Sequence, residues 1–317
     1  MPSSSNPVRV VIIGAGNVGA TFAYALLFRG LAAEIVLIDA NRARAEGESM
    51  DLNHAEPFTY PTRVWAGDYD DCAGAAIVVI TAGAGQRPGE TRLDLVKKNA
   101  EIFGKIVPEV SRRNPEGILL IATNPVDVLT QVSQKLSGLP PNRVIGSGTI
   151  LDTARFRYLL GKHFGVEPRS VHAYIVGEHG DSEVPVWSLA NIAGLRLADY
   201  ADLNGITHDQ AMLDDIFRRT RDAAYHIIER KGATYYAVAA GLMRIVEAIL
   251  RDQHTVLSVS SLITDYYGID GLCLSLPTVI GCNGIERVLR LQLSESEQMA
   301  LQRSAEVLRK SANTVGV

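Results

Sequence analysis

Short apolar runs alternate with helix-like segments over residues 8 to about 150. The runs are rich in β-branched residues and apolar on both faces, which is typical of strands in a doubly covered parallel sheet. They lie at 8–13 (VRVVII), 34–39, 75–81, 117–123 and 143–148. The segments between them show helical spacing, at 20–30, 43–55, 93–113 and 126–136. This alternation predicts a Rossmann-type, doubly wound α/β sheet with right-handed crossovers.

The second half of the chain has a different pattern. Helices are predicted at 152–165, about 207–230 and 234–251, with a strand at 170–177. The stretches 254–263 and 271–281 alternate and are separated by turn residues, as in an antiparallel sheet. Ser294 and Glu297 form a predicted capping box for a last helix. We therefore expect two closely packed domains, at 8–148 and 149–317, the second with a mixed α/β architecture.

Composition excludes several classes of protein. The net charge of −4 and the pI of about 6.0 do not suggest nucleic-acid binding, which needs a clustered basic surface. The apolar runs are far shorter than the ~20 residues of a membrane span. The first residues lack the pattern of a signal peptide. Three scattered cysteines form neither a disulfide framework nor a metal-ligand spacing. We expect a cytoplasmic protein with no metal, membrane or nucleic-acid partner.

A glycine motif follows the first predicted strand. Gly14, Gly16 and Gly19 give G-x-G-x-x-G before a helix, and Asp39 ends the next strand. Gly14 permits a tight turn, Gly16 lets a pyrophosphate approach the backbone, and Gly19 allows close packing. Asp39 would accept hydrogen bonds from a ribose diol and repel a 2′-phosphate, which favours NAD over NADP. A glycine-rich turn without a ligand is the alternative.

Further polar residues are expected at the carboxyl ends of the strands, where open α/β sheets bind ligands. His179 follows a predicted strand and has a pKa suited to proton donation near neutral pH. Asp152 would orient it and raise its pKa. Arg155, three residues on, offers a guanidinium fork for a substrate carboxylate. Each residue also has a structural alternative. His179 alone could be an ordinary loop histidine, and Asp152 and Arg155 could form an ion pair on a helix surface.

Two further loops supply polar residues to the same predicted site. Asn124 ends a strand in ATNPVDV, where Asn-Pro alone would fit an ordinary turn. The loop GQRPGETR supplies Gln86 and Arg92. On a closing loop, Arg92 would stabilise the charge that develops on a reduced carbonyl; a solvated arginine at a helix start is the alternative. Together these groups suit hydride transfer to a 2-oxo acid.

The motifs IGAGNVGAT, PGETRLDLVKKN, ATNPVDV, GTILDTARFR and VGEHGDSEVPVW resemble the L-lactate/L-malate dehydrogenase family from residue 8 to about 310, most closely its bacterial L-lactate dehydrogenases. The resemblance implies NAD-dependent reduction of pyruvate to L-lactate, with His179 as proton donor and acceptor and Asp152 as its partner. It implies that Arg155 binds the substrate carboxylate, Arg92 is a lid arginine, and Asn124 positions substrate and nicotinamide ribose. Further cofactor contacts are implied at Asn17, Val18, Arg44, Tyr69, Gly83, Ala84 and Ser147. A homotetramer acting in glycolysis and fermentation would fit the family.

The choice between lactate and malate depends on Gln86. By the resemblance, the residue six before the lid arginine is Gln in the lactate branch and Arg in the malate branch, and Pro88 and Gly89 fix this register. A neutral amide leaves a second substrate carboxylate unpaired, at a cost of several kcal/mol. Thr234 matches the lactate pattern at another wall of the pocket. A malate dehydrogenase stays the alternative, because a shift of one residue would place Arg87 there.

Two further expectations remain open. By the resemblance, Arg157 and His172 match positions where bacterial relatives bind fructose 1,6-bisphosphate across a subunit interface; structural interface residues are the alternative. A non-catalytic NAD-sensing module would keep the glycine motif but would not need His179, Asp152 and Arg155.

Overall fold

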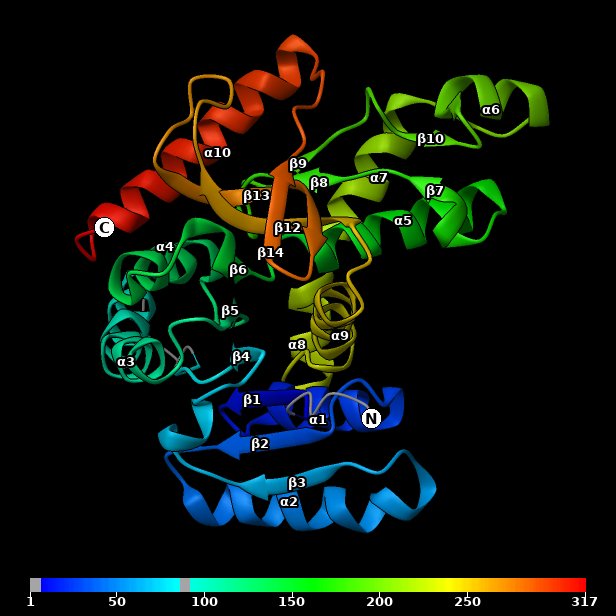
Figure 1. Ribbon diagram of the computed structural model, residues 1–317. Coiled ribbons are helices and arrows are strands. Elements are labelled where there is room, and N and C mark those ends of the chain that lie inside the picture. Colours follow the sequence, from blue (N-terminus) through cyan, green and yellow to red (C-terminus); the bar gives the residue numbers. More distant parts are fainter. Residues whose placement is uncertain (1–6, 86–91) are drawn as a thin grey trace.

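A nine-stranded sheet forms the centre of the computed structural model, which describes residues 7–85 and 92–317 (Figure 1). Its strand order is β14-β13-β12-β6-β5-β4-β1-β2-β3. All pairings within the first six strands are parallel. They are β1 (Arg9–Ile13), β2 (Glu34–Ile38), β3 (Arg63–Ala66), β4 (Ile77–Ile80), β5 (Ile118–Ile121) and β6 (Val144–Gly146). This order is that of a dinucleotide-binding fold, and it confirms the predicted Rossmann-type sheet.

Helices cover both faces of the parallel strands because successive strand residues point to opposite sides. Val10 and Ile12 of β1 join one apolar cluster, and Val11 and Ile13 join the other. The first cluster includes residues of α1 (Asn17–Arg29), α2 (Arg42–Ala55) and α9 (Tyr236–Leu250). The second includes residues of α3 (Arg92–Arg113) and α4 (Val126–Ser137). The continuous apolar runs of the sequence are therefore the buried strands.

An antiparallel extension carries the sheet into the second half of the chain. Strands β12 (Thr255–Ile263), β13 (Leu272–Gly281) and β14 (Gly284–Val288) pair antiparallel, and Ser260 of β12 pairs with Gly146 of β6. Helix α10 (Glu295–Asn313) packs on β13, and Ser294 with Glu297 forms its predicted capping box. The mixed α/β architecture expected for this half is thus confirmed.

The remaining elements of the second half are short. They comprise α5 (Ile150–Phe164), β7 (Val171–His172), β8 (Ile175–Val176), β9 (Val184–Pro185), β10 (Asn191–Ile192), β11 (Leu195–Arg196), α6 (Leu197–Asn204), α7 (Gln210–Arg221) and α8 (Ala223–Lys231). Turns of 3₁₀ helix lie at Glu56–Phe58, Tyr69–Cys72, Pro141–Arg143 and Pro168–Ser170. Among the described residues, no helix has the length and apolar character needed to cross a membrane.

Three details differ from the sequence-based prediction. The strand expected at 170–177 is divided into β7 and β8, and the helix expected at about 207–230 is divided into α7 and α8 at Asp222. Asp222 occupies the last cap position of α7 and the first cap position of α8, and its side chain pairs with Arg221 instead of capping α8. Strand β3 was not predicted, because only Val64 of its four residues is fully buried and the apolar signal is weak.

Candidate active site

The glycine motif forms a tight junction between β1 and α1. Gly14 has φ of 109°, and a Cβ there would lie 2.5 Å from the backbone nitrogen of Ala82. A Cβ on Gly19 would lie 1.9 Å from the carbonyl oxygen of Gly14. By contrast, a Cβ on Gly16 would meet nothing within 4 Å. Two of these glycines are therefore required by packing within the protein, whereas the third borders open space at the start of α1.

A cavity of about 560 Å³ lies beside this junction. Asp39 lines it at the end of β2, where its carboxylate accepts hydrogen bonds from the backbone N–H groups of Ala15 at 2.7 Å and Asn41 at 2.8 Å. Other lining residues predicted to contact the cofactor are Gly14, Gly16, Arg44, Tyr69, Gly83 and Ala84. The start of α1 and the carboxyl ends of β1, β2 and β4 thus surround one hollow. Its open backbone at Gly16 and its carboxylate at Asp39 fit a dinucleotide.

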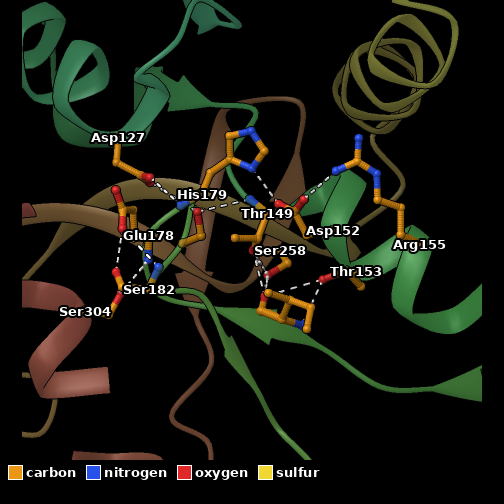
Figure 2. A network of polar contacts seen from close by, with 12 residues as sticks. Asp127, Thr149, Asp152, Thr153, Arg155, Glu178, His179, Ser182, Ser258 and Ser304 are labelled. Atoms are coloured by element: carbon orange, nitrogen blue, oxygen red, sulfur yellow. Dashed lines mark hydrogen bonds and ion pairs between the residues drawn. The ribbon is translucent and has the colours of Figure 1, made fainter. Parts of the chain in front are cut away.

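His179, which follows β8, comes together with Asp152 and Arg155 of α5 (Figure 2). The Nδ1 atom of His179 lies 2.5 Å from Oδ2 of Asp152. Oδ1 of Asp152 accepts a hydrogen bond from the Arg155 guanidinium at 3.0 Å. Asp152 is buried, whereas the His179 side chain is 23% exposed. One buried carboxylate therefore orients both a partly exposed imidazole and a guanidinium.

Hydroxyl groups at the start of α5 and on β12 hold this arrangement in place. The Thr149 hydroxyl donates to the carbonyl of Ile175 at 2.6 Å, and the Ser258 hydroxyl donates to the same carbonyl at 2.8 Å. The backbone N–H of Ile175 donates to the Thr153 hydroxyl at 3.0 Å. Helix α5, which carries Asp152, is thereby fixed to β8, the strand that leads to His179.

Burial and the neighbouring carboxylate have opposite effects on His179. Burial disfavours the charged ring and lowers its pKa, but Asp152 outweighs this effect and raises the pKa of His179 to about 9, with Asp127 and Glu183 adding to the rise. Burial likewise opposes charge on Asp152, yet His179 and then Arg155 lower the pKa of Asp152. Near neutral pH the pair is thus an imidazolium beside a carboxylate.

Two buried acids near His179 were not recognised from the sequence. Burial raises the pKa of Asp127 to about 6, and burial together with Asp152 raises the pKa of Glu183 to about 9. Asp127, in the first turn of α4, accepts hydrogen bonds from the backbone N–H of His179 at 2.8 Å and the Ser275 hydroxyl at 3.2 Å (Figure 2). It connects the loop that carries His179 to the helix that follows β5. Its place two residues after Asn124-Pro125 was a usable signal.

Asn99 was also missed, although it joins two of the predicted loops. This fully buried side chain of α3 accepts a hydrogen bond from the Ala84 N–H at 2.7 Å and donates to the Asn124 carbonyl at 2.8 Å. The Asn124-Pro125 peptide bond is cis, and Asn124 is exposed at the end of β5. Asn99 therefore holds the loops after β4 and β5 against each other.

The remaining predicted residues divide into two groups. Gln86 and Arg87 lie outside the described residues, and Arg92 is the first residue of α3. Four others lie where the chain enters or leaves an element: Asn17 and Val18 at the start of α1, Ser147 after β6, and Thr234, half-buried, between α8 and α9.

Arg157 and His172 lie on neighbouring elements, α5 and β7. Arg157 donates to the carbonyl of Ala173 at 2.8 Å, and its guanidinium lies 4.9 Å from the ring centre of Tyr174. His172 is exposed. Arg157 also lines a cavity of about 440 Å³ together with Arg169 and Arg244. This surface combines a hollow with several cations.

Comparisons with known proteins identify the same family in both halves of the chain. Residues 8–146 match the lactate/malate dehydrogenase NAD binding domain, and residues 149–316 match the lactate/malate dehydrogenase alpha/beta C-terminal domain. The L-lactate dehydrogenase of Acetivibrio thermocellus is 53% identical over 98% of each chain, and that of Priestia megaterium is 53% identical over 96% of this chain and 95% of the other.

Solved structures give the same result. A minor L-lactate dehydrogenase from Enterococcus mundtii is 41% identical with a TM-score of 0.95, and the match covers 99% of this chain and 100% of the other. A lactate dehydrogenase from a Medee basin deep-sea metagenome library is 44% identical with a TM-score of 0.94, and the match covers 98% of this chain and 99% of the other.

Proposed function

The chain belongs to the lactate/malate dehydrogenase family, and we propose that it is an NAD-dependent L-lactate dehydrogenase that reversibly reduces pyruvate to L-lactate. Relatives that carry this name are about as long as the chain and 53% identical to it. The observation that carries the proposal is the contact of 2.5 Å between Nδ1 of His179 and the buried Asp152 carboxylate, in a chain whose cavity at Gly16 and Asp39 fits a dinucleotide.

In the proposed reaction His179 moves the proton. When bound, NADH supplies the hydride that reduces the ketone carbon. Asp152 holds Nδ1 of His179 and keeps the ring charged. Nε2 then donates its proton to the ketone oxygen of pyruvate, and the neutral ring takes the proton back from L-lactate in the reverse direction.

The substrate is held by groups around this histidine. The Arg155 guanidinium donates to Asp152 through one nitrogen, and its other N–H groups are proposed to grip the pyruvate carboxylate. Asn124 is proposed to position the substrate, and Arg92 to polarise its carbonyl. Gln86 and Thr234 are proposed to surround the methyl group, where a second carboxylate would find no cation.

The cofactor is proposed to bind along the carboxyl ends of β1, β2 and β4. Its pyrophosphate would lie over Gly16 at the start of α1, and its adenosine ribose at Asp39. We propose contacts from the residues implied by the resemblance, namely Gly14, Asn17, Val18, Gly19, Arg44, Tyr69, Gly83, Ala84, Asn124 and Ser147. The division into an NAD-binding domain at 8–148 and a substrate domain at 149–317 is part of the same proposal.

We also propose a cytoplasmic homotetramer, acting in glycolysis and fermentation, whose activity responds to fructose 1,6-bisphosphate at Arg157 and His172. Arg157, Arg169 and Arg244 line an otherwise mostly apolar cavity there, and these three arginines support an anionic effector. Activity at low pyruvate with and without this compound tests the site, and an unchanged rate would contradict it. Light scattering of the purified protein tests the tetramer.

Replacing His179 with Asn tests the proposed chemistry. Loss of the proton donor should lower kcat for pyruvate by roughly 100-fold or more, while the dissociation constant for NADH stays nearly unchanged. Single-turnover absorbance and NADH fluorescence titration measure the two quantities. If the variant turns over pyruvate at the wild-type rate, His179 is not the proton donor.

A further inference from the structure

Three successive backbone N–H groups that end at His179 are held by three different elements of the fold. The N–H of Gly177 donates to a carbonyl of β13 at 2.9 Å. The N–H of Glu178 donates to the Ser304 hydroxyl of α10 at 2.8 Å. The N–H of His179 donates to the Asp127 carboxylate of α4 at 2.8 Å. Of these elements α10 lies farthest along the chain, and the proposed reaction gives it no role.

The Ser304 hydroxyl belongs to a closed chain of hydrogen bonds (Figure 2). The Ser182 hydroxyl donates to the Glu178 carboxylate, and its oxygen lies 3.1 Å from that of Ser304. Because a serine hydroxyl has only one proton to donate, Ser304 donates to Ser182 and accepts from the Glu178 N–H. The chain begins and ends on Glu178, so it fixes both the backbone and the side chain of the residue before His179.

Burial makes this contact with α10 hard to replace. Ser304 is fully buried, and Glu178 is 4% exposed. A buried N–H that loses its acceptor carries the cost of its desolvation. Without the Ser304 oxygen, the peptide group of Glu178 would have to turn toward another acceptor, and the chain that continues into His179 would turn with it.

Gly177 allows α10 to approach the loop this closely. Its φ is 89°, and a Cβ there would lie 2.6 Å from Oγ of Ser304. Any other residue would strain the backbone and displace the hydroxyl. The glycine two residues before His179 thus serves a contact with a residue that lies more than a hundred positions later in the chain.

The position of the His179 ring depends on this backbone. Its Nδ1 atom lies 2.5 Å from the carboxylate of Asp152 on α5. Helix α5 is bonded separately to β8, so Asp152 would stay in place if the peptide group before His179 turned. A displacement of about 1 Å at a reacting group can lower a rate by roughly 100-fold.

We propose that Ser304 is a positioning residue for the proposed reaction, holding the backbone before His179 through Glu178 and Ser182. The C-terminal helix thereby controls the contact between His179 and Asp152. This inference rests on the proposed function. Since Ser304 is fully buried, it acts through His179 rather than on the substrate.

Ser304→Ala removes the acceptor of the Glu178 N–H and the donor to Ser182. We expect kcat for pyruvate to fall by roughly 10- to 100-fold, with the dissociation constant for NADH unchanged. The alkaline midpoint of kcat/KM should fall below the pKa of about 9 that Asp152 gives His179, because the ring would lie farther from that carboxylate. Lower stability alone would leave this midpoint unchanged in the folded enzyme.

Ala305→Gly is the matched control. Ala305 is the next residue of α10 and is 4% exposed in an apolar cluster. Glycine weakens the helix and removes a buried methyl group, but leaves the Ser304 hydroxyl in place. This variant should melt at a lower temperature than the wild type and keep the wild-type kcat and pH midpoint.

Ser182→Ala interrupts the same chain of hydrogen bonds at another residue. If Ser182 and Ser304 act as one network, the double variant should lose little more kcat than the more affected single variant. Full additivity of the two losses would mean that the hydroxyls act separately.

An NMR titration of the His179 ring gives a readout that does not depend on turnover. Selective histidine labelling, with the signal assigned from its loss in His179→Asn, should show a lower pKa in Ser304→Ala than in the wild type and in Ala305→Gly. If the wild type does not reduce pyruvate, the proposed function fails, and this titration still decides the role of Ser304. A wild-type kcat and His179 pKa in Ser304→Ala, or an equal loss of kcat in Ala305→Gly, would overturn the inference.

Discussion

The charge on His179 depends on which of two opposing effects is larger. Burial favours the neutral ring, but the carboxylate of Asp152 at 2.5 Å favours the charged ring and prevails. The Asp127 carboxylate also favours the charged ring. A histidine that stays protonated well above its usual pKa is suited to donate a proton to a ketone.

The pH dependence of the two reaction directions follows from this shift. Pyruvate reduction needs the charged ring, so kcat/KM at saturating NADH should be high near neutral pH and fall as pH rises through about 9. Lactate oxidation needs the neutral ring and should rise through the same range. Initial rates at constant ionic strength measure both profiles. A midpoint near 6.5 for pyruvate would mean that Asp152 does not control the ring.

Asp127 acts on the site through the backbone of His179. Asp127→Ala removes the acceptor of that N–H and of the Ser275 hydroxyl, so kcat should fall and unfolding should become easier by about 1–3 kcal/mol. Asp127→Asn keeps an acceptor oxygen and should restore most of kcat. Denaturant unfolding and steady-state kinetics measure these effects. Equal kcat in the alanine variant and the wild type would exclude a positioning role.

At the scale of elements, two glycines of the motif have different roles: Gly19 is needed for packing, and Gly16 is proposed to be needed for ligand binding. Gly19→Ala places a methyl group against the Gly14 carbonyl and should lower the melting temperature, whereas Gly16→Ala meets no protein atom. Gly16→Ala should therefore melt like the wild type but bind NADH at least 10-fold more weakly. Thermal melting and fluorescence titration of NADH distinguish the two. Unchanged NADH affinity in Gly16→Ala would place the pyrophosphate elsewhere.

The sequence predicted long, strongly apolar elements better than short ones. Strands β1, β2, β4 and β5 were evident because every residue of their centres is buried. Strand β3 was not, since only one of its four residues is buried. Helical spacing does not reveal the division of 207–230 at Asp222.

Part of the candidate site was predictable from the sequence, because some of its residues lie in motifs. His179, Asp152 and Arg155 lie in recognisable motifs, and the structure brings them together. Asn99 and Asp127 were missed because each acts through backbone groups of residues distant in sequence. Their contacts exist only once α3, α4 and the catalytic loop have packed. Gln86, the proposed selector, lies outside the described residues, so its role remains a prediction.

At the scale of the whole molecule, two halves of the chain meet at one site. The first half supplies the cavity at Gly16 and Asp39, and the second supplies His179, Asp152 and Arg155. The Asp127 carboxylate connects α4 of the first half to the catalytic loop. Cofactor and substrate can therefore be held next to each other only when both halves are folded.

The comparison of pyruvate with oxaloacetate tests the central claim most directly. An unpaired second carboxylate costs about 3 kcal/mol or more, so kcat/KM should favour pyruvate by roughly 100-fold at pH 7 with saturating NADH. Gln86→Arg should shift this ratio toward oxaloacetate, and Gln86→Asn serves as a neutral control. A wild-type enzyme with the higher kcat/KM for oxaloacetate would contradict the assignment as an L-lactate dehydrogenase.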